Sequence, residues 1–134
     1  MDDRPATRRN DLLFPDESYR IKAACIAVHK ELGSGFLEKV YEKALAHELR
    51  KAGFRVRQQD PIQVFYDRVL VGDFVLDLLV DEKIVIEVKA TERAHPIHKA
   101  QLINYLKAGQ LPLGFLVNFG KEYFEFDRVV YTKK

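Results

Sequence analysis

The sequence contains a single cysteine, no tryptophan and no long hydrophobic run. Because Cys25 has no partner within the chain, it cannot form an intrachain disulfide, and a reducing cytoplasm is the expected compartment. No apolar stretch approaches the roughly 20 residues that would span a bilayer, so we expect no membrane segment. The first residues, MDDRPATRRNDLLFPDE, also lack the hydrophobic segment of a secretory signal.

The chain has little excess charge of either sign. It carries 22 Lys and Arg against 20 Asp and Glu, a formal net charge of +2, which is too small to indicate a nucleic-acid partner by itself. The basic residues are nevertheless concentrated between Lys83 and Lys107, where Lys89, Arg93 and Lys99 also lie. A local basic patch is therefore expected on an otherwise balanced domain.

Helix-like and strand-like stretches follow one another in a clear order. Residues 1–15 lack periodicity and predict a loosely ordered arm before a single domain over residues 16–134. Within this domain, apolar spacing predicts two helices, then strands of period two, a third helix and two last strands, over residues 16–32, 36–53, 54–90, 95–109 and 113–131. This order predicts an α/β fold with a mixed central sheet flanked by helices.

The second helix is expected to place one stripe of apolar residues against the core. Phe36, Val40, Leu45 and Leu49 follow the helical period. By the same periodicity Glu38, like the neighbouring Glu42, would be a solvated residue on a face rich in charge.

Charged residues interrupt the apolar stretch GDFVLDLLVDEKIVIEVKA, residues 72–90. Side chains alternate between the two faces of a strand, so Asp73 and Asp77 are expected on one face, and Glu87 and Lys89 on one face of the next strand. The DEK turn makes the two strands antiparallel neighbours. Carboxylates from both strands and a lysine can therefore converge on one point.

Such a group of side chains suits hydrolytic chemistry. Two carboxylates can bind Mg²⁺ or Mn²⁺, which polarise a phosphoryl oxygen, and a neighbouring lysine can hold or deprotonate the attacking water. The alternative interpretation is a structural ion pair across two strands. Asp73 is more simply explained as an acid near a strand end and solvent.

The arrangement resembles the PD-(D/E)XK nuclease superfamily, which has an acid on one strand and Glu-x-Lys on the next. These positions are Asp77 and Glu87-Val88-Lys89 here, although Leu76 replaces the proline of the family pattern. GFLEKVY, residues 35–41, fits the GxxExxY signature of one branch, and the blocks DFVLDLLV, KIVIEVKA, AQLINYL and GFLVNFG are similar to that branch in the same order. The resemblance covers roughly residues 18–131 and implies a PD-(D/E)XK (restriction endonuclease-like) core that binds a divalent metal.

The resemblance also implies roles for further residues. Glu38 would join the metal site through a water molecule, and Gln101 and Tyr105 match a QxxxY element in which the glutamine positions the site and the tyrosine contacts substrate or supports the helix. Arg93 and Lys99 are the expected phosphate contacts. For Gln101 the alternative is an ordinary helix-surface residue, and for Tyr105 it is packing.

Three hypotheses follow for function. The first is a Mg²⁺- or Mn²⁺-dependent deoxyribonuclease with Asp77 and Glu87 as metal ligands and Lys89 at the attacking water. The second is a catalytically idle module of the same fold that binds nucleic acid or another protein, and the third is a plain α/β scaffold. The sequence leaves a homodimer open.

Overall fold

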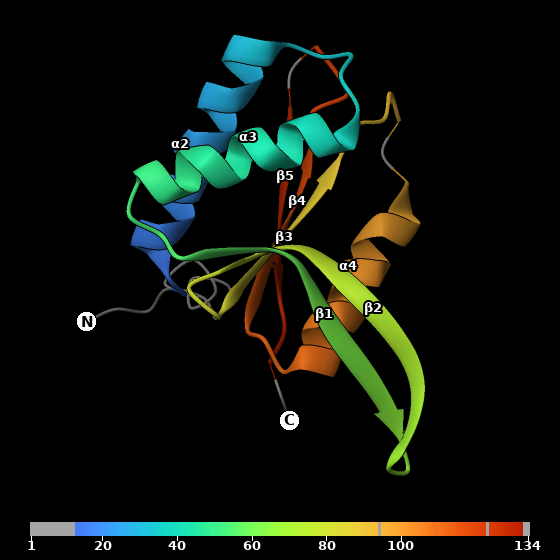
Figure 1. The fold of residues 1–134 in the computed structure, drawn as a ribbon. Coiled ribbons are helices and arrows are strands. Elements are labelled where there is room, and N and C mark those ends of the chain that lie inside the picture. Colours follow the sequence, from blue (N-terminus) through green and yellow to red (C-terminus); the bar gives the residue numbers. More distant parts are fainter. Residues whose placement is uncertain (1–12, 94, 123, 133–134) are drawn as a thin grey trace, which may run out of the picture.

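The computed structural model describes residues 13–93, 95–122 and 124–132. Most of the predicted N-terminal arm, residues 1–12, lies outside the described residues. The elements are α2 (Pro15–Leu32), α3 (Glu38–Lys51), β1 (Val56–Tyr66), β2 (Val69–Val80), β3 (Ile84–Lys89), α4 (Pro96–Gly109), β4 (Leu113–Asn118) and β5 (Glu125–Val130). This is the predicted order, and it confirms an α/β fold (Figure 1).

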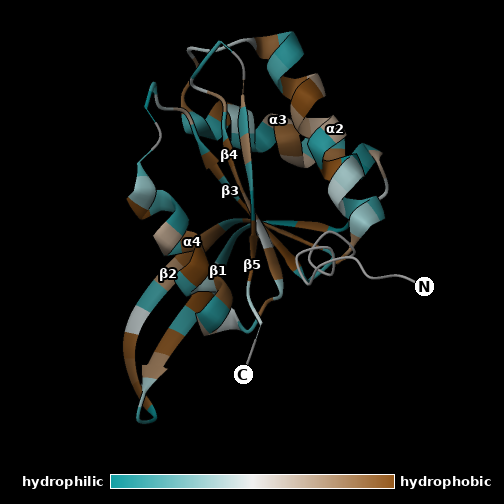
Figure 2. Ribbon diagram, turned by 180° about the vertical axis from the view of Figure 1, so that it is seen from behind, coloured by the Kyte–Doolittle hydropathy of each residue, from teal (hydrophilic) through white to brown (hydrophobic). Residues whose placement is uncertain are grey.

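The strands form one mixed sheet in the order β1-β2-β3-β4-β5. Neighbouring strands are antiparallel except β3 and β4, which are parallel because α4 crosses over between them. The central strands β3 and β4 are buried along nearly their whole length, as expected for strands covered on both faces, and Figure 2 shows them as mostly hydrophobic.

Helices cover both faces of the sheet (Figures 1 and 2). The larger core lies between the sheet and the α2–α3 pair, and it includes Tyr41, Leu78, Ile86 and Val88. The smaller core lies under α4 and joins Leu102 and Leu106 to apolar residues of the sheet. In the described part of the chain, no helix is long and apolar enough to cross a membrane.

The core stripe of α3 differs from the prediction. Leu45 and Leu49 are buried as expected, but Phe36 and Val40 are exposed. The helix begins only at Glu38, and its buried face is rotated by one position so that Tyr41 and Glu42 turn inward. The larger ring explains the shift, since Tyr41 stacks on Phe119 at 4.7 Å between ring centroids.

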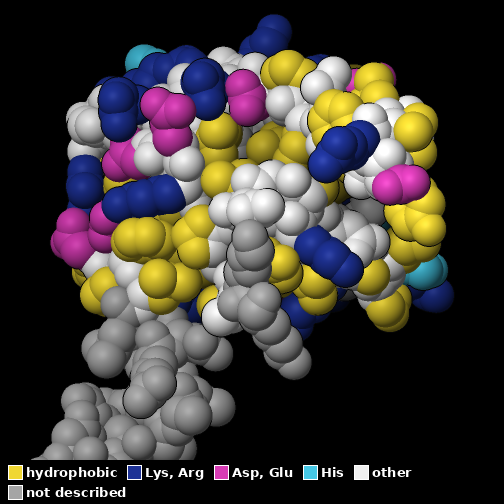
Figure 3. Space-filling model, turned by 90° about the horizontal axis from the view of Figure 1, so that it is seen from below, with side chains coloured by type: hydrophobic (Ala, Val, Ile, Leu, Met, Phe, Trp, Pro, Cys, Tyr) yellow, Lys and Arg dark blue, Asp and Glu magenta, His cyan; other side chains and the backbone are white. Residues whose placement is uncertain are grey.

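Strands β1 and β2 form a long hairpin that extends past the rest of the sheet (Figure 1). Its turn is Asp67-Arg68, with φ of 51° and 66°, the left-handed backbone typical of two-residue hairpin turns. Only the last residues of β2, Leu78 to Val80, pair with β3. Exposed hydrophobic side chains accumulate at this end of the molecule, beside basic ones (Figure 3).

Candidate active site

Asp77 and Glu87 lie against each other where β2 and β3 separate. The backbone ladder between these strands ends at Leu78 and Ile86. Beyond it the N–H of Asp77 donates to Oε2 of Glu87 at 3.0 Å, and the N–H of Val88 donates to Oδ2 of Asp77 at 2.8 Å. The two carboxylates thus replace backbone carbonyls as acceptors, and this fixes their position.

The other carboxylate oxygens, Oδ1 of Asp77 and Oε1 of Glu87, accept no hydrogen bond from any described residue. Burial and the proximity of Asp77 raise the pKa of Glu87 to about 8. Burial also raises the pKa of Asp77, although its bond from Val88 opposes the shift. Proximity and burial therefore disfavour two negative charges at this position, which is the electrostatic condition that a bound cation relieves.

The backbone around Asp77 departs from regular alternation. Leu76 and Leu79 both belong to the core under α4, whereas Leu78 between them belongs to the opposite core. On the partner strand Gln59 has a φ of 52°, in the left-handed region that non-glycine residues rarely adopt. The expectation that Asp73 shares the face of Asp77 rested on strict alternation, which does not hold here. Strained backbone of this kind is often found at functional sites.

Lys89 ends β3, two residues beyond Glu87. Its charge lowers the pKa of both Asp77 and Glu87, so the lysine interacts electrostatically with both carboxylates. Among the described residues, Lys89 makes no ion pair within 4.0 Å with either acid. A tight structural ion pair, the alternative interpretation of these residues, is therefore absent from this part of the chain.

Glu38 is the first residue of α3 and is exposed. Its charge raises the pKa of Asp77 and that of His98. Its side chain forms no hydrogen bond or ion pair with a described residue. Among those residues the carboxylate is therefore unpaired, and its charge acts on Asp77 from the start of α3.

Sequence reasoning missed Glu42, which is buried with 4% of its surface exposed. Its two carboxylate oxygens accept hydrogen bonds from Nε2 of Gln58 at 3.2 Å and Nε2 of Gln59 at 2.7 Å. Its charge raises the pKa of both Asp77 and Glu87. The only signal in the sequence was its position one turn after Glu38.

Helix α4 contributes the other predicted residues. Tyr105 is half-buried, its ring lies 5.3 Å from that of Phe74, and its pKa is raised by burial and by the charges of Glu87 and Asp77. Gln101 is exposed one turn earlier and lines the same groove as Tyr105. The side chains of Arg93 and Lys99 are exposed in the segment that leads from β3 into α4.

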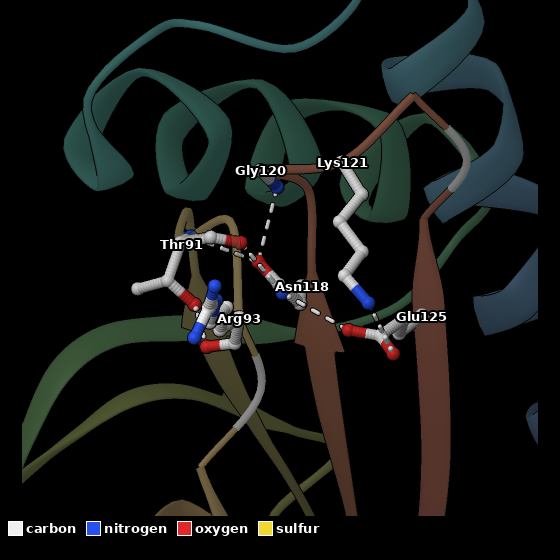
Figure 4. A network of polar contacts seen from close by, with 6 residues as sticks. All are labelled: Thr91, Arg93, Asn118, Gly120, Lys121 and Glu125. Carbon is white, nitrogen blue, oxygen red and sulfur yellow. Dashed lines mark hydrogen bonds and ion pairs between the residues drawn. The ribbon is translucent and has the colours of Figure 1, made fainter.

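A polar network after β3 was also missed (Figure 4). Oδ1 of Asn118 accepts from the N–H of Thr91 and the N–H of Gly120, each at 3.0 Å, and its Nδ2 donates to the carbonyl of Thr91 and to Glu125. Lys121 pairs with the same glutamate at 3.3 Å. Since Asn118 is paired with Lys89 in the parallel register, the network fixes the backbone that follows the lysine.

Two histidines beside this network have separate roles. His95 accepts a hydrogen bond from the N–H of Ile97 through Nδ1 and so caps α4. His98 lines a small cavity with Lys89 and Asn118, and burial and the charge of Lys89 lower its pKa. In the described ranges no group of three or more His, Cys, Asp or Glu side chains could hold a metal ion.

Comparison with protein families gives the chain its classification. Residues 15–129, most of the chain, match the model of the PD-(D/E)XK nuclease superfamily. Comparison with the curated proteins gave no match. The match extends from the start of α2 into β5 and so includes both core helices, the central strands and the two facing carboxylates. The chain belongs to the PD-(D/E)XK nuclease superfamily.

Proposed function

We propose that this protein is a divalent-metal-dependent nuclease that hydrolyses DNA phosphodiester bonds. The observation that carries the proposal is the hydrogen-bonded pair of Asp77 and Glu87, with Lys89 two residues further along the same strand. Nuclease-type function agrees with the superfamily to which the chain belongs. A scaffold without function would gain nothing from two facing acids whose charges oppose each other.

The donor atoms fit a hard divalent cation. Asp77 and Glu87 would hold Mg²⁺ or Mn²⁺, with Glu38 joining through a water molecule, because Asp77 and Glu87 each keep one carboxylate oxygen that accepts no hydrogen bond from a described residue. Two protein carboxylates with the remaining positions left to water are typical of Mg²⁺. When bound, such an ion polarises a phosphoryl oxygen and acidifies a water molecule.

The remaining residues orient the reactants. Lys89 would donate a hydrogen bond to the attacking water as an ammonium group, or accept the proton of that water as a neutral amine, since its charge acts on both carboxylates without an ion pair to either. Gln101 would position the water or phosphate from α4, and Tyr105 would contact the substrate. Arg93 and Lys99 would bind neighbouring phosphates.

We also propose that the chain belongs to the GxxExxY branch, because residues 35–41 fit that signature and its glycine and tyrosine both have structural tasks. Gly35 has a φ of 112°, a backbone conformation that glycine adopts readily and that other residues rarely adopt. The hydroxyl of Tyr41 donates to the carbonyl of Gly33 at 2.5 Å and accepts from the N–H of Phe36 at 3.2 Å. The glycine and the tyrosine thus shape the turn that presents Glu38 as the first residue of α3.

The free, buried Cys25 suits a cytoplasmic protein.

The test is cleavage by the purified protein with Mg²⁺ or Mn²⁺ on single-stranded, duplex and branched DNA and on RNA. We expect cleavage of DNA that chelation abolishes and that Glu87→Gln, which keeps the size of the side chain, reduces by at least about a hundredfold. Lys39→Ala, an exposed change beside Glu38, is the control that should keep full activity. Activity retained in Glu87→Gln, or no cleavage of any substrate by a folded wild-type protein, would contradict the proposal.

A further inference from the structure

A groove of about 670 Å³ runs between the β1–β2 hairpin and α4. Its volume falls within the range of roughly 300–1,000 Å³ that is usual for ligand sites. The walls are held close together at one point, since a Cβ atom added to Gly109 would lie 2.7 Å from Cδ1 of Ile62. The groove is therefore formed by packed elements, α4 on one side and β1 on the other.

The groove combines aromatic rings with amide side chains. Phe65 and Phe74 are 58% and 40% exposed, although both are large apolar residues. The amide side chains are those of Gln63, Gln101, Asn104 and Gln110. The other lining residues are Val64, Tyr105, Lys107 and Ala108. Lys107 is the one charged side chain among them, and none of them is acidic.

We propose that this groove binds unpaired bases of a single-stranded nucleic acid next to the bond that is cleaved. Exposed aromatic rings bind single strands by stacking on bases, and this contact tolerates any sequence because every base has a π face. Side-chain amides can donate to and accept from base edges, and a lysine can bind a phosphate. The described lining contains all three kinds of group and no carboxylate that would repel the backbone.

The lining chemistry favours unpaired bases over a duplex. In a double helix the faces of the bases are stacked on one another and are closed to a protein ring unless the base is extruded. Phe65 and Phe74 could therefore stack only on a strand that is already single or locally opened. A duplex would use the phosphate contacts alone.

The groove borders the candidate active site at Tyr105. Gln101 and Tyr105 line the groove, and Tyr105 packs against the apolar cluster that contains Leu76, the residue before Asp77. The ring of Tyr105 packs against that of Phe74, which connects the site to the hairpin. The inference thus rests on the proposed function and adds the form of the substrate.

The test measures binding without catalysis. The full chain, in chelator and without divalent metal, is titrated into fluorescein-labelled oligothymidylate, oligouridylate and a fully paired DNA duplex, and fluorescence anisotropy reports affinity. We expect the single strands to bind more tightly than the duplex. Phe74→Ala and Phe65→Ala should each weaken single-strand binding by roughly 5- to 150-fold, the effect of losing one stacked base.

The matched control is Tyr66→Ala, which removes another exposed aromatic ring from the same hairpin but outside the groove lining. It should leave affinity unchanged. Thermal unfolding checks that all variants fold. Phe65→Ala alters the more exposed of the two groove rings and so keeps the test valid if Phe74→Ala is unstable.

The outcomes separate this inference from the nuclease proposal. Groove variants that bind like the wild type, equal affinity for duplex and single strand, or no binding by the wild type would each overturn the groove assignment, even if the protein cleaves DNA. A wild-type dimer in sedimentation that Phe65→Ala dissociates would assign the groove to a second copy of the chain and overturn it as well. Selective binding without cleavage would support the groove and contradict the nuclease. A preference for thymidylate or uridylate would identify the nucleic acid.

Discussion

Asp77 and Glu87 are joined by a hydrogen bond from the backbone of one to the side chain of the other, at 3.0 Å, at the point where two strands separate. Their carboxyl groups lie side by side, that of Glu87 buried and that of Asp77 partly buried, and burial raises the pKa of each. The protein thus keeps in place two acids that destabilise each other when both are charged.

Stability without metal should fall as pH rises from 4.5 to 8. The pKa of Glu87 is about 8 in the folded protein against 4.5 as its ordinary value, so within this window the folded state holds a proton that the unfolded state has lost. Unfolding therefore releases a proton, and the free energy of unfolding decreases by at most about 1.4 kcal/mol per pH unit from this group. This decrease is measured by urea denaturation of the wild type and of Glu87→Gln, in chelator and at several pH values.

The variant supplies the control for this pH dependence. Glu87→Gln removes the ionisable group and should equal or exceed the wild type in stability at pH 8. A large loss of stability in the variant at that pH would instead mean that the ionised Glu87 stabilises the fold through an ion pair.

Metal addition should reverse the loss at high pH. We expect Mn²⁺ to raise the thermal midpoint of the wild type more at pH 8 than at pH 6, since cation and proton compete for the same carboxylates. Asp77→Asn and Glu87→Gln should abolish this shift. The control is Glu48→Gln, which removes a partly buried acid of α3 that is paired with Lys51, and it should show the same shift as the wild type. A full shift in both site variants would exclude Asp77 and Glu87 as ligands.

Lys89→Ala should abolish cleavage while sparing metal binding. An ammonium group beside a cation is not a ligand, so its proposed role is toward water or phosphate. Calorimetry with Mn²⁺ gives the binding constant, and a plasmid or oligonucleotide assay gives the rate. A variant that cannot bind Mn²⁺, or one that cleaves at the normal rate, would contradict this role.

Asn118→Ala should destabilise the protein and also slow the reaction. The side chain makes four hydrogen bonds in a buried position, and losing them leaves backbone groups of Thr91 and Gly120 unsatisfied, at about 1–3 kcal/mol for each buried group. Asn104→Ala, an exposed change, should alter stability by no more than about 0.5 kcal/mol. Denaturant unfolding measures the stability of the two variants, and a cleavage assay measures the rate. Equal stability of the two variants would refute the structural role of Asn118.

Binding to nucleic acid should weaken as salt increases. Three exposed basic side chains lie on α4 and on the segment before it: Arg93, Lys99 and Lys107. Replacing one of them by alanine should reduce the slope of log affinity against log salt by about 0.7 for a single strand. Lys51→Ala, at the far end of α3 and paired with Glu48, serves as the control. Binding that does not respond to salt would point to a protein partner instead.

Much of the fold could be predicted from the sequence because the signals are local. Period-two patterns and the DEK turn predicted β2 and β3 as antiparallel neighbours, and the structure pairs them. The spacing of Asp77 and Glu87 around that turn brings them together through short-range geometry alone. The superfamily match agrees with the resemblance seen in these blocks.

The structure also reveals features that depend on contacts between distant segments. Glu42 is buried because Gln58 and Gln59, on a strand after the helix, satisfy its carboxylate. Strict alternation fails around Asp77, where Leu76 and Leu78 belong to opposite cores, and on the partner strand Gln59 has a left-handed backbone. Such arrangements combine burial with partners far apart in the chain, and no periodicity encodes them.

The sequence by itself determined the order of the elements, the adjacent acids and the lysine beside them, since these follow from local pattern and from a short turn. Only the tertiary structure decided which face of α3 is buried, that Asn118 holds the backbone after Lys89, and that Phe65 and Phe74 line a groove with α4. The physical reason is packing. A ring such as Tyr41 stacking on Phe119 rotates a helix, and the charged side chains it carries move with it.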